Sequence, residues 1–442
     1  MKSKVPILLS VIGAVALADA GTNSAAAQQP GSSVDTLHLG ALQTEAVTRD
    51  PRRQQLTLLE SQSRLRLRSI ADERLPDLTL GAQAQYQSDV ATIPFELPGT
   101  SVATPPLDSY DARLNLRQPL LDPTRRHRVE VERARLAESQ AGVRTSLFKL
   151  REQVTESYFA VLLLDAQRAE LEAGIADLEA RLVTARDRVR LGSALPSDAA
   201  TLEAELLRRR QSIDEIDANR AASLAVLGEL TGRSLTGDDV LALPDIGDDV
   251  ARVRTELGEL RERPEYDRFA RSHELLERQK LSIVAQERPR LSAFGRAGYG
   301  RPGLNPLGRD FDSYWLAGLQ VEWSPWNWGR SDRQREEIAL QQRVLETEEA
   351  AFRKSLLRGT EADLAAMDRL VASSQSDDQI VALHEDILRE TTFRFTEGVI
   401  GSAEYVDRQT DLLTARLTRA THRVELARAR AHFLTFVGVE VR

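Results

Sequence analysis

The residues that could serve catalysis or metal binding are few and scattered in this 442-residue sequence. It contains no cysteine, which excludes disulfides, thiolate metal ligands, cysteine nucleophiles and a cysteine-linked lipid anchor. No glycine-rich phosphate loop or serine nucleophile elbow is present. The histidines show no i, i+4 pair and no neighbouring carboxylates at ligand spacing: His38, His127, His273, His384, His422 and His432. We therefore expect no enzyme, no metal site and no cofactor.

The charged residues are mostly interspersed. The 59 Lys and Arg are interspersed with 67 Asp and Glu, and the net charge is −8. The absence of a basic cluster argues against a nucleic-acid partner. The acidic pairs at 238–239 and 248–249 lack the alternating ligands of a calcium loop, so we interpret them as solvated turns. The basic run 125–128 opens a helix and allows two interpretations, namely a contact to a lipid headgroup or neighbouring protomer, or a solvated face.

The tryptophans indicate a membrane. All four lie in one stretch: Trp315, Trp323, Trp326 and Trp328. From 315 to 323, apolar and polar side chains alternate with a period of two, which predicts a strand with one apolar face. Eight residues at about 3.3 Å each span roughly 26 Å, close to the ~25 Å apolar band of an outer-membrane barrel. The rings of Trp315 and Trp323 would mark its edges, and the other two would lie in an aromatic belt.

Three other segments show the same alternation. Strands are predicted at about 78–87, 110–118, 291–300 and, for the tryptophan strand, 314–323. Pro119 is expected to close the second. Tyr86, Tyr110 and Tyr299 lie on the apolar faces and would join the belt. The polar faces include Thr79, Gln83, Gln85, Asn115, Gln320 and Glu322.

Long helices occupy most of the remaining chain. No proline interrupts 124–192, and an a/d seam there is followed by a turn at 192–196 and a second seam, in which Arg209 takes an apolar position. This pattern predicts a long antiparallel helical hairpin. Residues of the first half return 206 positions later, as Gly192, Asp198 and Leu206 do at Gly398, Glu404 and Leu412.

The chain is therefore predicted to be a tandem repeat. Lysines 2 and 4, an apolar run and small residues up to Ala27 predict a signal peptide, 1–27. The first repeat covers 28–232, a linker 233–259, and the second repeat 260–442 with its hairpin tip at 398–402. Four such strands cannot lie in lipid as an open sheet, because their edges would be unpaired. Two protomers would give eight strands and a filled core, whereas three would give twelve and a lumen.

The chain resembles the TolC-like outer membrane efflux proteins in the order and spacing of several short motifs. They are Asp50-Pro51, Gln118–Asp122, Arg263-Pro264 and Arg394–Gly398. The resemblance implies a mixed, mostly α fold: a trimer with a twelve-stranded transmembrane barrel and a long periplasmic α-helical coiled-coil tunnel. It implies the outer membrane of a Gram-negative bacterium, contact with its lipid, a periplasmic adaptor (membrane fusion protein), and an inner-membrane RND, MFS or ABC transporter.

The same resemblance places a gate at the hairpin tips. By position, Glu404 and Asp407 match the family's ring of paired acids, which would attract cations, and Asp198 matches their partner on the first hairpin. Phe395 and Ile400 stand where the best-known member has a tyrosine and an arginine. Closure is therefore expected to depend on apolar packing of Phe395, Val399 and Ile400. The alternative is that Glu404 and Asp407 are solvated helix charges. Adaptor contact is expected at Gly192, Ser193, Ala194, Gly398 and Val399.

Three functions fit this pattern. The first is a passive trans-periplasmic duct for efflux, opened at its periplasmic tip by the adaptor and pump. The second is the same duct in type I protein secretion with an ABC transporter. The third, a non-conducting periplasmic coiled-coil scaffold, leaves the four lipid-matched strands unexplained.

Overall fold

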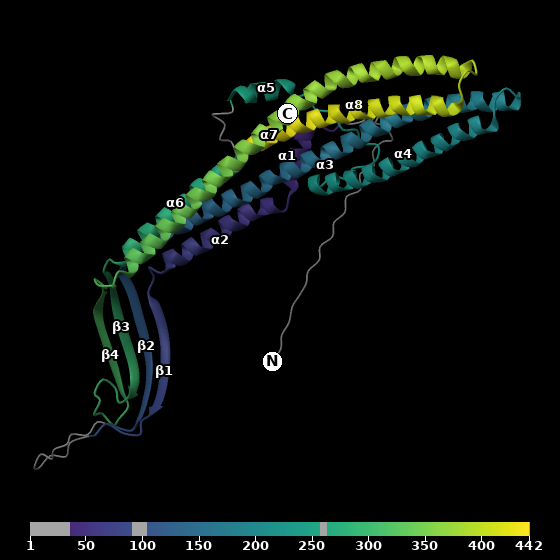
Figure 1. Cartoon of the computed structure of the whole chain (residues 1–442). Helices are drawn as coiled ribbons and strands as arrows, with labels where there is room; N and C mark the ends of the chain where they lie inside the picture. Colours follow the sequence, from purple (N-terminus) through teal and green to yellow (C-terminus); the bar gives the residue numbers. More distant parts are fainter. Residues whose placement is uncertain (1–35, 91–103, 257–262, 442) are drawn as a thin grey trace, which may run out of the picture. The chain divides into compact units, whose positions relative to one another are not determined.

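The computed structural model describes residues 36–90, 104–256 and 263–441, so the predicted signal peptide lies outside the described residues. One order of elements occurs twice along the chain (Figure 1). After α1 (Leu39–Arg49) come α2 (Arg52–Asp72), β1 (Asp77–Tyr86), β2 (Asp108–Leu121), α3 (Thr124–Arg190) and α4 (Pro196–Thr231). After α5 (Gly247–Glu256) come α6 (Pro264–Gln286), β3 (Arg290–Arg301), β4 (Asp312–Glu322), α7 (Arg330–Thr396) and α8 (Ser402–Val437). The predicted mixed, mostly α fold is confirmed.

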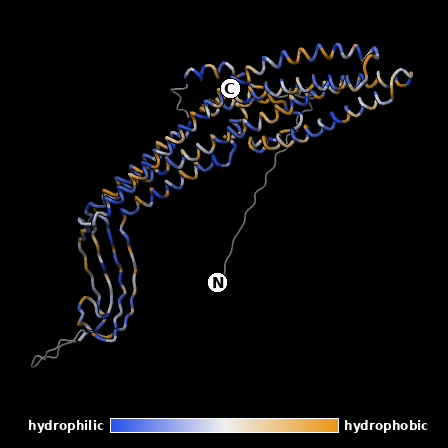
Figure 2. The backbone as a smooth tube through the Cα atoms, viewed as in Figure 1, coloured by the Kyte–Doolittle hydropathy of each residue, from blue (hydrophilic) through white to orange (hydrophobic). Residues whose placement is uncertain are grey.

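The four strands form one antiparallel sheet in the order β1-β2-β3-β4. Their register keeps apolar side chains on one face, as in the row Leu80, Leu114, Ala297 and Trp315. Since side chains alternate along a strand, the next row lies on the opposite face and contains Thr79, Asn115, Arg296 and Leu316. The alternation of hydrophobic and hydrophilic residues can be followed along the strands in Figure 2.

The expectation that Pro119 closes the second strand is wrong. Strand β2 continues to Leu121, with a bulge between Pro119 and Leu121 in its pairing with β3. Pairing with β1 ends earlier, at Arg117. Pro119 therefore has no strand on that side, and an edge position tolerates a residue that cannot donate a backbone hydrogen bond.

The long helices form two antiparallel hairpins, α3 with α4 and α7 with α8. Helix α3 also packs against α8, so the hairpins contact each other (Figure 1). Asp122 fixes the start of α3, because its Oδ1 accepts hydrogen bonds from the Thr124 amide at 3.0 Å and hydroxyl at 2.6 Å. Among the helices that the structure describes, none is both long and apolar enough to cross a lipid bilayer.

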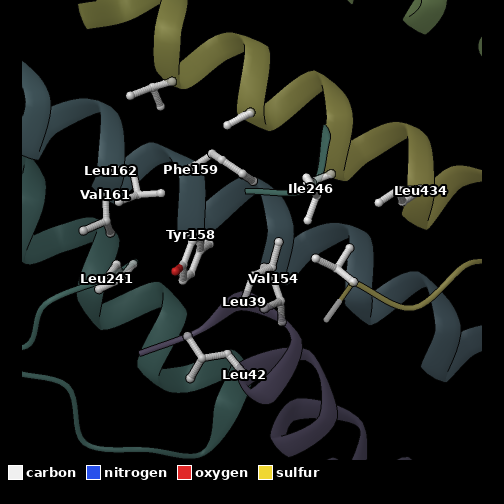
Figure 3. Packing of buried hydrophobic residues seen from close by; sticks show 14 of the residues in the cluster. Leu39, Leu42, Val154, Tyr158, Phe159, Val161, Leu162, Leu241, Ile246 and Leu434 are labelled. Atoms are coloured by element: carbon white, nitrogen blue, oxygen red, sulfur yellow. The ribbon is translucent and has the colours of Figure 1, made fainter. Parts of the chain in front are cut away.

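The largest hydrophobic core among the described residues joins α1, α3, α4, α5, α7 and α8, and part of it is shown in Figure 3. Tyr158, fully buried in this core, lies with its hydroxyl oxygen 2.8 Å from the Leu37 carbonyl and 2.5 Å from that of Ala242. Leu37 also forms a parallel bridge with Leu241. Burial raises the pKa of Tyr158, so its hydroxyl stays neutral. These contacts fasten the segment between the repeats to the helices.

Arg263 is a buried cation at the start of α6. Its guanidinium carbon lies 4.9, 5.6 and 5.4 Å from the ring centroids of Phe148, Phe352 and Phe436. Its Nε and Nη2 donate to the buried Glu265 carboxylate at 2.9 and 2.6 Å, and its Nη1 donates to the Phe436 carbonyl at 2.8 Å. This single side chain thus connects α3, α6, α7 and α8.

Candidate functional site

The two hairpin tips are built by the same backbone turn. Gly192 and Gly398 have φ values of +75° and +77°, a left-handed conformation that costs little only for glycine. Beyond them, the Ser193 amide donates to the Arg188 carbonyl and the Val399 amide to the Arg394 carbonyl, both at 2.9 Å. These bonds end α3 and α7 in the same way. The 206-residue spacing read from the sequence thus corresponds to two equivalent turns.

Asp198 connects the two tips. Its Oδ1 accepts hydrogen bonds from the Ser402 amide at 3.0 Å and hydroxyl at 2.9 Å, at the start of α8. The residue that precedes Ser402 is Gly401, which has no side chain to cap the helix. Asp198 therefore supplies that cap from the other hairpin, while its Oδ2 accepts from the Leu195 amide at 3.3 Å. The bond from Ser402 lowers the pKa of Asp198.

Arg188 makes the complementary contact at the end of α7. Its Nη1 donates to the Phe395 carbonyl at 2.8 Å and lies 3.4 Å from the Thr396 carbonyl. A Cβ placed on Gly398 would lie 2.5 Å from Arg188 Nη2, so the glycine also makes room for the guanidinium. A cation thus lies at the negative end of α7 and an anion at the positive end of α8, both supplied by the first hairpin. We call these contacts of Arg188 and Asp198 the tip cross-caps.

A small hydrophobic cluster lies behind the cross-caps. Phe395 and Tyr405 stack with ring centroids 5.0 Å apart and belong to a buried cluster with Leu178 and Leu202. The Tyr405 hydroxyl donates to Asp177 Oδ2 at 2.5 Å. Burial, and then the bond to Asp177, raise the pKa of Tyr405, which keeps it a donor. This cluster lies between the two hairpins of one protomer.

The predicted apolar gate residues lie in different environments. Phe395 is buried and Ile400 packs against the same cluster, whereas Val399 is 67% exposed. Gly192, Ser193 and Gly398 are exposed, and Ala194 is half-buried. Phe395 and Ile400 therefore stabilise the tip from within the protomer, and Val399 is left for contacts outside it.

The predicted acidic pair lies exposed in the first two turns of α8. Glu404 Oε1 is 3.6 Å from Arg394 Nη1 of α7. Asp407 is one turn further on the same side of the helix and forms no ion pair with any residue in the described ranges. Both carboxylates are thus available to a solute or a neighbouring chain.

The aromatic residues predicted to form the membrane belt lie at both ends of the sheet. At the loop end, Phe311 packs between Tyr110 and Tyr299, with ring centroids 6.0 and 5.7 Å away. Tyr86 and Trp315 are 74% and 76% exposed on the same apolar face. The other three tryptophans follow β4: Trp323 donates to the Glu287 carbonyl at 3.0 Å, and Trp326 and Trp328 meet edge to face. Since β4 ends at Glu322, Trp323 lies just beyond the strand predicted to contain it.

Two histidines lie within hydrogen-bonding distance of carboxylates that are distant in the sequence. His422 Nδ1 lies 2.7 Å from Asp377 and His432 Nδ1 lies 2.9 Å from Asp363, each pair joining α8 to α7. The bond to Asp363 raises the pKa of His432. The partners are 45 and 69 residues apart, beyond any local motif. No group of three or more potential metal ligands occurs among the described residues.

The basic run 125–128 divides between two roles. Arg128 Nη1 donates to Glu73 at 2.8 Å and Nη2 to Asp122 at 3.2 Å, which ties α3 to the end of α2. Arg126 is 86% exposed and pairs with Glu130 of its own helix. Within this run, Arg126 alone is exposed and can reach a lipid headgroup or a neighbouring chain.

Comparison with known proteins gives one family-model match to part of the chain and one fold. Residues 45–233 match the family model described as outer membrane efflux protein. No match was found among curated proteins. The outer membrane protein VceC of Vibrio cholerae has a TM-score of 0.66 at 15% identity, over 91% of this chain and 97% of that one. The outer membrane channel CmeC of Campylobacter jejuni has a TM-score of 0.65 at 14% sequence identity, and the match covers 90% of this chain and 85% of CmeC. The outer membrane channel MtrE of Neisseria gonorrhoeae, in its open state, has a TM-score of 0.64 at 16% sequence identity, and the match covers 91% of this chain and 89% of MtrE.

Proposed function

We propose that this chain is one protomer of a passive exit duct through the periplasm and outer membrane. The match of residues 45–233 to the outer membrane efflux protein model supports this proposal. The main support is the four-stranded sheet, because none of the described helices covers its apolar face. Leu80, Trp315 and Val321 on that face are 84%, 76% and 68% exposed. A patch of this kind on a soluble protein would be an interaction or aggregation site, whereas in a bilayer it is the lipid-facing surface.

Closure of the sheet requires further copies of the chain. Strands β1 and β4 each have one unpaired edge, which lipid cannot satisfy. Pairing β4 of one protomer with β1 of the next uses two different edges, and such head-to-tail contacts generate rings. Three protomers give twelve strands and a water-filled lumen. Helices α2 and α7 carry exposed apolar residues for the same contact, including Leu58, Leu65, Leu340 and Val344.

The helical hairpins would then extend the duct into the periplasm. The tips would meet the periplasmic adaptor, with Gly192, Ser193, Ala194, Gly398 and Val399 as the contact residues. An inner-membrane transporter of the RND, MFS or ABC type would supply the energy. The uncovered apolar sheet speaks against a water-soluble periplasmic scaffold.

We place the gate at the tips, where Glu404 and Asp407 of three protomers would give six carboxylates near a narrow axis. Crowded like charges attract cations, and multivalent cations most strongly. The double variant Glu404→Ala with Asp407→Ala is therefore expected to lose at least tenfold in sensitivity to block by a trivalent cation. Planar-bilayer recordings of the purified oligomer measure this, and the detergent-solution mass confirms that assembly is unchanged.

The matched control is Asp411→Ala, a half-buried acid on the same helix whose carboxylate pairs with Arg408 at 3.0 Å. Its block should equal that of the parent protein. Unchanged block in the double variant would remove Glu404 and Asp407 from the gate. An oligomer that conducts under no condition would instead contradict the duct itself.

A further inference from the structure

Arg296 lies in the middle of the polar face of the sheet and has no acidic partner among the described residues. It is exposed on β3, and its Nε donates to the side-chain oxygen of Asn115, directly opposite on β2, at 2.9 Å. No acidic side chain in the described ranges forms an ion pair with it. A neutral amide thus holds this guanidinium and leaves its charge uncompensated.

The other charges of this face are paired or lie at the strand ends. Arg113 donates to Asp111 at 2.9 Å, and Asp111 also accepts from the Tyr314 hydroxyl at 2.5 Å. Arg117 lies 3.9 Å from Glu322. The remaining charges are Asp77, Arg290 and Asp312, at the first residue of β1, β3 and β4 respectively.

The register separates Arg296 from the acids of this face. Asp111 and Asp312 pair with Gly300, which is four residues from Arg296, about 13 Å at the rise of a strand. This exceeds the ~10 Å Debye length at 0.1 M salt. The centre of the polar face therefore carries a net positive charge even though acids and arginines balance more closely over the whole face.

Neighbouring bulky side chains lie flat on the sheet. A Cβ placed on Gly298 would lie 2.5 Å from the Tyr314 ring, and one on Gly318 would lie 2.8 Å from the Phe294 ring. Both rings thus cover glycines. Arg296 lies in the row between these two pairs as an exposed long side chain.

We propose that Arg296 forms a ring of positive charge midway through the barrel lumen and favours anionic solutes, those bearing carboxylate, phosphate or sulfonate groups, in the outer-membrane section. This inference rests on the proposed function, since it requires three sheets closed with their polar faces inward. Rings of basic side chains select anions in pores. The sign is opposite to that of the acidic tip, so the duct would have two filters in series.

The test measures chloride over potassium permeability from reversal potentials across a KCl gradient. The Glu404→Ala, Asp407→Ala oligomer is the background, because the acidic tip would otherwise dominate the selectivity. In that background, Arg296→Gln is expected to lower the chloride to potassium ratio roughly two- to threefold near 0.1 M salt, with the difference lost near 1 M. Arg296→Lys, which keeps the charge, should retain the chloride to potassium permeability ratio of the Glu404→Ala, Asp407→Ala background.

Two results would overturn the inference, and they are distinguishable. A conducting Arg296→Gln oligomer with the parent ratio at 0.1 M would remove Arg296 as a filter and leave the duct intact. Absence of conductance in every variant, parent included, would overturn the duct and the filter together.

Discussion

Alanine at both Arg188 and Asp198 is expected to raise the opening equilibrium of each tip roughly 30-fold. These residues form the tip cross-caps, so the double variant leaves the start of α8 and the end of α7 without charged partners. Losing a helix cap costs about 1 kcal/mol and losing a favourable charge at a helix end a similar amount. Together these give about 2 kcal/mol per protomer, and 1.4 kcal/mol is tenfold in an equilibrium. We expect opening to separate the second hairpin tip from the first.

Single-channel recording gives the open fraction directly. Arg190→Ala is the matched control, because this exposed arginine pairs with Asp187 of its own helix at 3.0 Å and does not reach the other hairpin. It should leave the open fraction unchanged. Asp198→Asn keeps an acceptor oxygen and loses the charge, so its effect should be intermediate. If the double variant opened no more often than Arg190→Ala, the two hairpins would move together during opening and the cross-caps would not restrain it.

Alanine at Arg263 is expected to lower the free energy of unfolding by about 3–5 kcal/mol, the cost of leaving the partner of a buried ion pair uncompensated. Glu265 would be that partner, since it is 7% exposed and receives two hydrogen bonds from Arg263. The variant would also lose cation–π contacts with three phenylalanines. Guanidinium titration of the detergent-purified protein, followed by far-UV circular dichroism, measures the loss.

Arg271→Ala is the control on the same helix. This arginine is 46% exposed and pairs with Asp267 and Glu274 at 3.2 Å, contacts worth at most about 1 kcal/mol at a surface. Arg263→Lys should recover only part of the stability, because lysine cannot bind the carboxylate with two parallel bonds. A loss at Arg263→Ala no larger than at Arg271→Ala would show that the buried pair contributes little.

Much of the fold could be predicted because local sequence patterns determine it. A period of two fixes which face of each strand is apolar, and the observed register keeps Leu80, Leu114 and Trp315 on one face. Glycine after a long proline-free helix predicts a turn, and Gly192 and Gly398 adopt the positive φ that such an end requires. In both cases the chemistry lies within a few residues of the feature it explains.

The candidate site was harder to predict because its partners are far apart in the chain. Asp198 and Ser402 are separated by 204 residues, and Arg188 and Phe395 by 207. Its position in the sequence identified Asp198 as a residue of the hairpin tip, but the sequence did not indicate that Asp198 caps α8. The one local signal was Gly401, which starts a helix without a side chain to cap it and so requires a donated acceptor. Nothing in the sequence around Tyr405 indicated its stacking on Phe395.

The most direct test of the proposed duct is planar-bilayer conductance of the detergent-purified oligomer, with its mass determined on the same sample. We predict a particle of three chains that gives small, cation-selective steps, because closed tips with exposed Glu404 and Asp407 limit the current. A water-soluble monomer without conductance would contradict the barrel, and with it the duct.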